Sequence, residues 1–235
     1  MKRIGIIGSG SIGTALARLA LAAGYEVTIA NSRGPESLKD LIKEIGPGAH
    51  AGEVRDAAEF GDIPVLSVPL TAYPNLPEGL FDGKTVLSTG NYYPFRDGRI
   101  AELDTLEMTT AEYEQSLLPG AQVVKAFNNI VAHHIPLLAN SQPPTALPVA
   151  GDDAEIKGRV GSVVHDFGFD TVDAGTLAQS WRFEPESGAY TPIYAASQEG
   201  FRQDYLADRG APVSSDRLRE FLAESARPDV AAREF

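Results

Sequence analysis

Residues 3–33 hold the pattern that most constrains how this chain can fold. A short apolar segment that begins at Arg3 runs directly into the glycine-rich turn Gly8-Ser-Gly-Ser-Ile-Gly13. The Ala- and Leu-rich segment 14–23 is typical of a helix, and residues 26–30 are typical of a second strand. Strand, glycine turn, helix and strand, in this order, predict a βαβ unit of the kind that binds dinucleotides.

Each glycine of the turn has a separate expected task. Gly8 permits the tight turn, Gly10 lets a pyrophosphate approach the backbone, and Gly13 lets the helix pack closely on the strand. The pyrophosphate is expected at the helix N-terminus, where free N–H groups and the helix dipole favour an anion. A glycine turn that binds nothing is the simpler alternative, but the flanking strand and helix favour dinucleotide binding.

The end of the second strand indicates which dinucleotide is bound. NAD-binding proteins usually place Asp or Glu there to hold the ribose 2′-hydroxyl, whereas this chain has Asn31, Ser32 and Arg33. A guanidinium can hold a 2′-phosphate through charge-assisted hydrogen bonds, and a hydroxyl can add a contact. We therefore expect NADP(H) as the cofactor. In the alternative interpretation, Arg33 is a solvated loop arginine.

The composition restricts the classes of function. The chain has 235 residues, a formal net charge of −12 and no cysteine. The negative charge argues against general nucleic-acid binding. The lack of cysteine excludes disulfides, thiolate catalysis and Cys-ligated metal centres, and no Asp, Glu or His cluster has a metal-ligand spacing. We see neither a membrane-spanning run nor a signal peptide, so we expect a cytoplasmic protein that does not bind membranes.

Strand-like and helix-like segments alternate along most of the chain. Further strands are expected at 49–51, 63–68, 85–89, 122–127, 145–150 and 169–173, and further helices at 35–45, 54–60, 110–118 and 153–167. Thr110 is the expected N-cap of the helix that starts there. This alternation favours an α/β protein with a Rossmann-type, doubly wound, mostly parallel sheet and a C-terminal helical extension.

Two parts of the chain differ in character. We predict an NADP-binding Rossmann domain at 1–175 and a helical C-terminal extension at 176–235. The extension is rich in aromatic residues, so we expect it to pack on the sheet or on a partner subunit. The second possibility is compatible with a homodimer.

Polar or glycine-rich residues follow several of the expected strands. Because ligands bind outside the carboxyl ends of parallel strands, we expect these residues and the glycine turn to line one crevice. Each segment alone is explained as well by the simple end of a strand, but together they favour a site. The candidate cofactor-binding residues are Gly8, Ser9, Gly10, Ser11, Ile12, Gly13, Asn31, Ser32, Arg33, Ser67, Val68, Pro69, Thr89, Gly90, Asn91 and Asn128.

The sequence names no catalytic residue. His133 and His134 follow Asn128 closely and could reach the crevice, although positions on a surface helix are the simpler interpretation. His50 and His165 are expected far from this edge. Hydride transfer needs little acid–base machinery when the acceptor is a conjugated ring, so the sequence is compatible with a flavin-like acceptor. It is less compatible with a dehydrogenase of alcohols, which needs a general acid.

Several motifs, in their order, resemble the F420-dependent NADP oxidoreductase family. They are Ile4–Gly13, Asn31–Arg33, Ser67–Pro69, Val124–Asn128, Val149–Asp153 and Phe167–Gly175. Proteins of that family pass a hydride reversibly between NADPH and the deazaflavin coenzyme F420. The same type of domain forms the NADPH-binding part of membrane ferric reductases.

The resemblance implies a role for each matching position. It places the backbone amides of Ser9, Ser11 and Ile12 at the pyrophosphate, Ser32 and Arg33 at the 2′-phosphate, Val68 and Pro69 beside the nicotinamide ribose, and Asn91 and Asn128 near the ring or the acceptor. The expected function is an NADP-dependent oxidoreductase with a small-molecule redox acceptor, either coenzyme F420 as a co-substrate or a flavin-like ring. Two alternatives stay open: reduction of a small imine or carbonyl, and an NADP(H)-binding sensor without catalysis.

Overall fold

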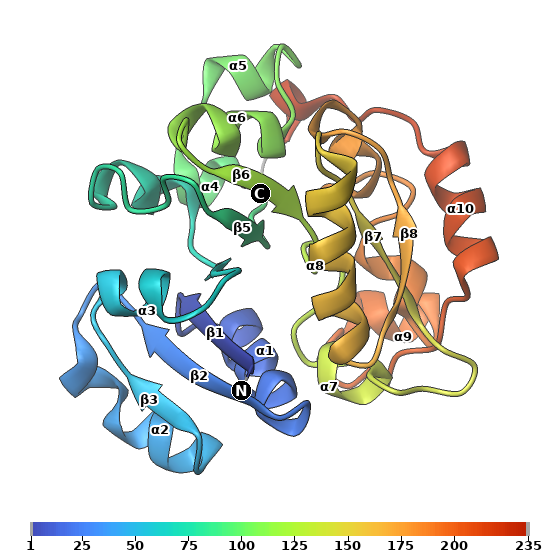
Figure 1. The fold of residues 1–235 in the computed structure, drawn as a ribbon. Coiled ribbons are helices and arrows are strands. Elements are labelled where there is room, and N and C mark those ends of the chain that lie inside the picture. Colours follow the sequence, from blue (N-terminus) through green and yellow to red (C-terminus); the bar gives the residue numbers. More distant parts are fainter. Residues whose placement is uncertain (1, 234–235) are drawn as a thin grey trace.

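Six parallel strands form the main sheet of the molecule, for which a computed structural model describes residues 2–233 (Figure 1). The strands are β1 (Lys2–Ile7), β2 (Tyr25–Ala30), β3 (Ala49–Ala51), β4 (Val65–Leu66), β5 (Thr85–Ser88) and β6 (Gln122–Lys125). Their order across the sheet is β3-β2-β1-β4-β5-β6, and each neighbouring pair is parallel. This is the doubly wound Rossmann order, so the expected fold class is confirmed.

The central strands are buried on both faces. Ile6 of β1 pairs with Ile29 of β2 on one side and with Val65 of β4 on the other, and all three side chains have an exposed fraction of 0%. Continuous apolar runs of this kind are typical of parallel strands that helices cover on both sides. The covering helices α1 (Ser11–Ala22) and α3 (Val54–Phe60) pack against β1 and β2.

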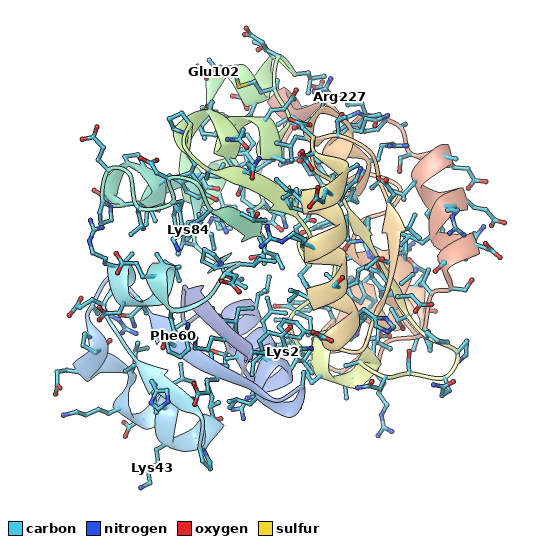
Figure 2. The ribbon with its side chains drawn as sticks, viewed as in Figure 1. Lys2, Lys43, Phe60, Lys84, Glu102 and Arg227 are labelled. Carbon is cyan, nitrogen blue, oxygen red and sulfur yellow. The ribbon has the colours of Figure 1, made fainter. Side chains whose placement is uncertain are left out.

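The remaining crossovers contain short helices. They are η1 (Pro35–Leu38), α2 (Lys39–Ile45), η2 (Leu70–Asn75), α4 (Pro94–Asp97), α5 (Ala101–Asp104), α6 (Thr110–Leu117) and α7 (His134–Leu138). Several of these lie outside the expected helices, because helices of one turn carry no periodic pattern. Figure 2 shows Lys43 of α2 and Glu102 of α5 extending away from the body of the molecule.

The expected N-cap of α6 is wrong by one residue. Thr109, not Thr110, caps this helix: its hydroxyl accepts a hydrogen bond from the Glu112 backbone N–H at 3.1 Å. The Glu112 carboxylate in turn accepts from the Thr109 backbone N–H at 2.8 Å. This reciprocal pair is a capping box, which fixes the start of the helix more strongly than a threonine alone.

The last two strands form a separate sheet. β7 (Ala146–Val149) and β8 (Asp170–Asp173) pair in parallel, with α8 (Ala154–Asp166) as their crossover helix. One antiparallel bridge, between Lys125 and Ala150, joins this pair to the end of β6. The single continuous sheet suggested by the alternation is therefore interrupted, since the chain reverses direction between β6 and β7.

Residues 177–232 pack partly on this second sheet and partly on the main-sheet side, where they contact α5, α6 and β6. Their elements are η3 (Leu177–Phe183), η4 (Thr191–Tyr194), α9 (Gln198–Gln203), α10 (Ser215–Glu224) and η5 (Val230–Ala232). α10 packs against β7 and β8, and the Tyr194 hydroxyl donates to the Ala146 carbonyl at 2.9 Å. Figure 1 shows this lobe, yellow to red, beside the main sheet, blue to green. The boundary at residue 175 stays a prediction.

None of the helices among residues 2–233 has the length and apolar character to cross a bilayer.

Candidate functional site

The glycine turn fits tightly between β1, β4 and α1. Gly8 has φ 118°, and a Cβ placed there would lie 2.0 Å from the Ser67 carbonyl oxygen. A Cβ on Gly13 would lie 2.0 Å from the carbonyl oxygen of Gly8. A side chain at Gly8 would push the turn away from the end of β4, and one at Gly13 would push α1 away from the turn, so both positions require glycine. The turn therefore holds the N-terminus of α1 directly over the end of β1.

The N-terminus of α1 is open. Gly10 is its N-cap, no side chain caps the helix, and the first turn contains no acidic residue. A Cβ on Gly10 would meet no atom within 4 Å. Unsatisfied N–H groups and the positive end of the helix dipole are thus presented to open space, which is the arrangement that binds a phosphate group.

The loop after β2 lies beside the glycine turn. Asn31 links the two, because its Nδ2 donates to the Ser9 hydroxyl at 3.1 Å and its Oδ1 accepts from the Arg33 backbone N–H at 2.9 Å. Ser32 and Arg33 are exposed. The Arg33 guanidinium has no hydrogen bond or ion pair with any residue in the described range 2–233. It is therefore free to contact an anion beside the turn.

A cavity of about 470 Å³ opens at the carboxyl ends of β1, β4, β5 and β6. This volume lies within the ~300–1,000 Å³ typical of small-molecule sites. The structure brings these predicted residues to its walls: Gly10, Ser11, Ile12, Ser67, Val68, Pro69, Thr89, Gly90, Asn91 and Asn128. The other candidates, Gly8, Ser9, Gly13, Asn31, Ser32 and Arg33, form the adjoining turn and loop and do not line the cavity. Their role in binding stays a prediction.

Sequence reasoning missed the other half of the cavity except for His133, which it named as able to reach the crevice. Its further lining residues are Tyr93, Arg96, Ile130, Val131, Ala132, His133, Tyr190, Thr191, Tyr205 and Leu206. Tyr93 and Arg96 follow the predicted strand end at Asn91, so extending that segment by a few residues would have found them. Nothing in the sequence indicated that the four residues from 190 onward line the cavity, because they reach it only when the tail folds over the strand ends.

Two buried asparagines join the ends of β5 and β6. Asn91 Nδ2 donates to the Asn128 carbonyl at 2.7 Å, and Asn128 Nδ2 donates to Asn91 Oδ1 at 3.1 Å. The residue before Asn128, Phe127, has φ 61°, which costs about 1–2 kcal/mol for a residue with a side chain. Strain of this kind is often found at functional sites. Asn128 Oδ1 is buried and has no hydrogen-bond partner among the described residues.

Two tyrosine hydroxyls meet in the cavity. Tyr93 and Tyr190 lie within hydrogen-bonding distance of each other, and Asn91 Nδ2 lies 3.5 Å and 3.3 Å from their respective hydroxyl oxygens. Burial, and then the neighbouring Tyr93 hydroxyl, raise the pKa of Tyr190 well above its ordinary value. The Arg96 guanidinium lies over the Tyr93 ring, 4.9 Å from its centroid. The cavity thus contains the Tyr190 hydroxyl, which holds its proton, near a guanidinium that is paired with the Asp97 carboxylate at 2.7 Å.

The surface-helix interpretation of the paired histidines is wrong. His134 has an exposed fraction of 0%, and His133 lines the cavity. Their Nε2 atoms lie 2.8 Å (His133) and 3.0 Å (His134) from the Asp208 carbonyl oxygen, and the rings of Phe201 and Tyr205 lie nearby. The fold of the tail explains the burial, since Asp208 and these rings cover the start of α7.

The fold and the cavity together define a Rossmann-type dinucleotide-binding protein. The comparisons narrow this class. A family model described as "NADP oxidoreductase coenzyme F420-dependent" matches residues 3–92. A solved structure of the hypothetical protein SMa0349 from Sinorhizobium meliloti is 32% identical, with a TM-score of 0.67, and the alignment covers 77% of this chain and 88% of that one. The chain belongs to this family of NADP-dependent oxidoreductases.

Two further proteins show how widely the fold is used. The metalloreductase STEAP3 of Rattus norvegicus is 28% identical over 185 residues, which are 77% of this chain but only 36% of that protein. An imine reductase from Myxococcus stipitatus, solved in complex with NADP+, is 19% identical, with a TM-score of 0.56, and the alignment covers 76% of this chain and 56% of that one. At this identity the second likeness concerns the fold alone.

Proposed function

We propose that this protein binds NADP(H) and transfers a hydride between it and an organic acceptor in the same cavity. One observation carries the proposal. The open N-terminus of α1 and the polar ends of β4, β5 and β6 line a single cavity of about 470 Å³. A dinucleotide that places its pyrophosphate at the helix would extend along the strand ends, which is how ligands bind at the edge of a doubly wound sheet.

The residues present fit NADP(H). The backbone N–H groups of Ser11 and Ile12 would hold the pyrophosphate. Ser32 and Arg33 would hold the 2′-phosphate, since both are exposed beside the turn and neither is a carboxylate that would repel it. Asn128 Oδ1, which has no hydrogen-bond partner among residues 2–233, would accept an N–H of the carboxamide. When bound, the reduced dinucleotide supplies the hydride.

For the acceptor, we propose first a deazaflavin such as coenzyme F420, or another flavin-like ring. The family to which the chain belongs supports this choice, and the aromatic side chains of Tyr93, Tyr190 and Tyr205 in the cavity wall suit a planar ring. A second acceptor class, small molecules with a C=N or C=O bond, is favoured by the contact between the Tyr93 and Tyr190 hydroxyls, because such acceptors need a proton donor.

Anaerobic stopped-flow absorbance tests the proposal. The protein is mixed with NADPH or NADH and with oxidised coenzyme F420, and both chromophores are followed. Coupled loss of both signals with NADPH, and not with NADH, is the expected result. Binding of NADPH without transfer to F420, flavins, imines or ferric chelates would contradict hydride transfer and favour a sensor. Absence of NADPH binding would contradict the proposal as a whole.

A further inference from the structure

Two tyrosines from distant parts of the chain share one corner of the cavity. Tyr93 precedes α4 and Tyr190 precedes η4, 97 residues further along the chain. Both line the cavity, and their hydroxyls are hydrogen-bonded to each other. The family match ends at residue 92, so neither tyrosine belongs to the part of the chain that the family model describes. Their contact therefore needs an explanation from the geometry itself.

A count of donors and acceptors shows what the pair can do. The amide of Asn91 has two protons on Nδ2: one is donated to the Asn128 carbonyl at 2.7 Å, and the other faces the two hydroxyl oxygens. The pair has two hydroxyl protons, of which one forms the bond between Tyr93 and Tyr190. No acceptor among the described residues takes the other one. One hydroxyl proton is thus available to a molecule in the cavity.

The electrostatics favour a donor over a base. Burial and the neighbouring hydroxyl raise the pKa of Tyr190 well above its ordinary value, so it holds its proton at neutral pH. The Asn91 amide and the partner hydroxyl also stabilise the negative charge that stays on the tyrosine oxygen after the proton leaves. The Asn91 amide has an N–H within reach of both oxygens. The Arg96 guanidinium lies over the Tyr93 ring, where the Asn91 carbonyl holds it at 2.6 Å. The buried Asp97 carboxylate pairs with this guanidinium at 2.7 Å, so its charge is already compensated.

We propose that the hydroxyl pair of Tyr93 and Tyr190 is the proton donor for an acceptor with a C=N or C=O bond. This inference rests on the proposed hydride transfer and selects the second of its two acceptor classes. A flavin-like ring needs no such donor at its hydride-accepting position, whereas an imine nitrogen or carbonyl oxygen becomes strongly basic as the hydride arrives.

The proposed step balances in atoms and electrons. A hydride adds to the acceptor carbon and forms a C–H bond, while the π-electron pair moves to nitrogen or oxygen. That atom takes the available hydroxyl proton, and the N–H or O–H bond forms as the tyrosine O–H bond breaks. The resulting phenolate is held by its partner hydroxyl and by Asn91 until water returns a proton. In sum, the acceptor gains two electrons and two protons, and NADPH is oxidised to NADP+.

Two matched acceptors test the proposal directly. 3,4-Dihydroisoquinoline, a neutral imine above its own pKa, needs both a hydride and a proton, whereas its N-methyl iminium salt needs only the hydride. The substitutions Tyr190→Phe and Tyr93→Phe, alone and combined, remove the hydroxyls and keep the rings. In the combined variant we expect the rate with the neutral imine to fall by about 100-fold or more. The rate with the iminium salt should stay within about threefold of wild type.

Binding and titration supply readouts besides activity. NADPH affinity, measured by fluorescence, should be unchanged in the variants. The ultraviolet absorbance of phenolate should show one fewer late-ionising tyrosine in Tyr190→Phe than in the wild type, in which the pKa values of Tyr25, Tyr73, Tyr92 and Tyr194 are also raised. Tyr113→Phe is the matched control, since Tyr113 lies on α6 outside the cavity and its hydroxyl makes no hydrogen bond to the described residues.

The outcomes separate this inference from the proposed function. Equal loss with both acceptors would show that the tyrosines only support the structure and would overturn the proton-donor role. A wild-type protein that reduces the iminium salt but not the imine would also overturn it, while hydride transfer would stand. A wild-type protein that binds NADPH but reduces neither acceptor would overturn the assigned acceptor class. Absence of NADPH binding would contradict the proposed function itself.

Discussion

Lys125 Nζ lies 3.4 Å from Glu114 Oε2, and both side chains have an exposed fraction of 0%. Glu184 Oε1 lies 3.7 Å from the same nitrogen. One cation and two carboxylates therefore share the interior directly behind the strand end at Gly90, where a Cβ would lie 1.8 Å from Glu114 Oε1. This buried network ties β6 to α6 and to η3, and it supports one wall of the candidate site.

Removal of the lysine from this network should be strongly destabilising. In Lys125→Met both carboxylates stay buried without their cation, so we expect the free energy of unfolding to fall by about 3–5 kcal/mol. Urea unfolding followed by circular dichroism measures it. The control is Lys157→Met, whose partner Asp173 is 67% exposed, and which should lose about 1 kcal/mol or less. Equal losses in the two variants would contradict the claim that burial of the carboxylates makes the loss of Lys125 more destabilising.

Two glycine-to-alanine substitutions should act in opposite directions. A Cβ at Gly13 would lie 2.0 Å from a backbone oxygen, whereas a Cβ at Gly158, which is exposed within α8, would meet nothing within 4 Å. Gly13→Ala should therefore lower the free energy of unfolding by about 1–3 kcal/mol. Gly158→Ala should raise it by about 0.5–1 kcal/mol, because alanine favours the helix. Chemical denaturation measures both, and a neutral Gly13→Ala would refute the tight turn.

The exposed Arg33 should decide between the two nicotinamide dinucleotides. If its guanidinium holds the 2′-phosphate, Arg33→Ala removes charge-assisted bonds worth about 1.5–3 kcal/mol. The dissociation constant for NADPH should then rise by about 10- to 150-fold, while that for NADH stays nearly unchanged. Fluorescence titration measures both constants. Arg219→Ala on α10 is the control, and equal changes for the two dinucleotides would refute the 2′-phosphate contact.

The sequence was most informative where local patterns decide the structure. Each central strand is a short apolar run bounded by glycine or polar residues, and the glycine spacing from Gly8 to Gly13 is specific to a turn between a strand and a helix. The βαβ unit and the strand-end half of the cavity could therefore be predicted. The capping box of Thr109 and Glu112 carries a local signal too, Thr-x-x-Glu, but the prediction overlooked it and placed the cap one residue late, at Thr110.

The rest depends on contacts between distant segments. Tyr190 reaches Tyr93 across 97 residues, and Asp208 reaches His134 across 74. The tail that carries Tyr190 and Asp208 consists largely of single turns, which have no hydrophobic period to reveal which side faces the sheet. The separation of the β7–β8 sheet from the main sheet likewise follows from a reversal of the chain direction, which strand patterns do not encode.

The buried His134 should make stability depend on pH. Burial lowers its pKa, and the adjacent His133 lowers it further, against an opposing effect of Asp208. In the unfolded chain the pKa of histidine is about 6.5, so below that pH the unfolded state binds more protons than the folded state. The contribution of neutral His134 is therefore complete above about pH 6.5 and is lost as the pH falls toward the lower folded pKa.

His134→Gln isolates this effect, because glutamine keeps an N–H donor for the Asp208 carbonyl and does not titrate. The carboxylate of Asp208 stays charged in this window: burial alone would raise its pKa, but backbone N–H bonds from Ala196, Gly210 and Ser197 outweigh this and lower it. Urea unfolding between about pH 7.5 and about pH 5 should show a smaller loss of stability in the variant than in the wild type. Parallel pH profiles would show instead that His134 keeps an ordinary pKa and that the aromatic cover of α7 does not desolvate it.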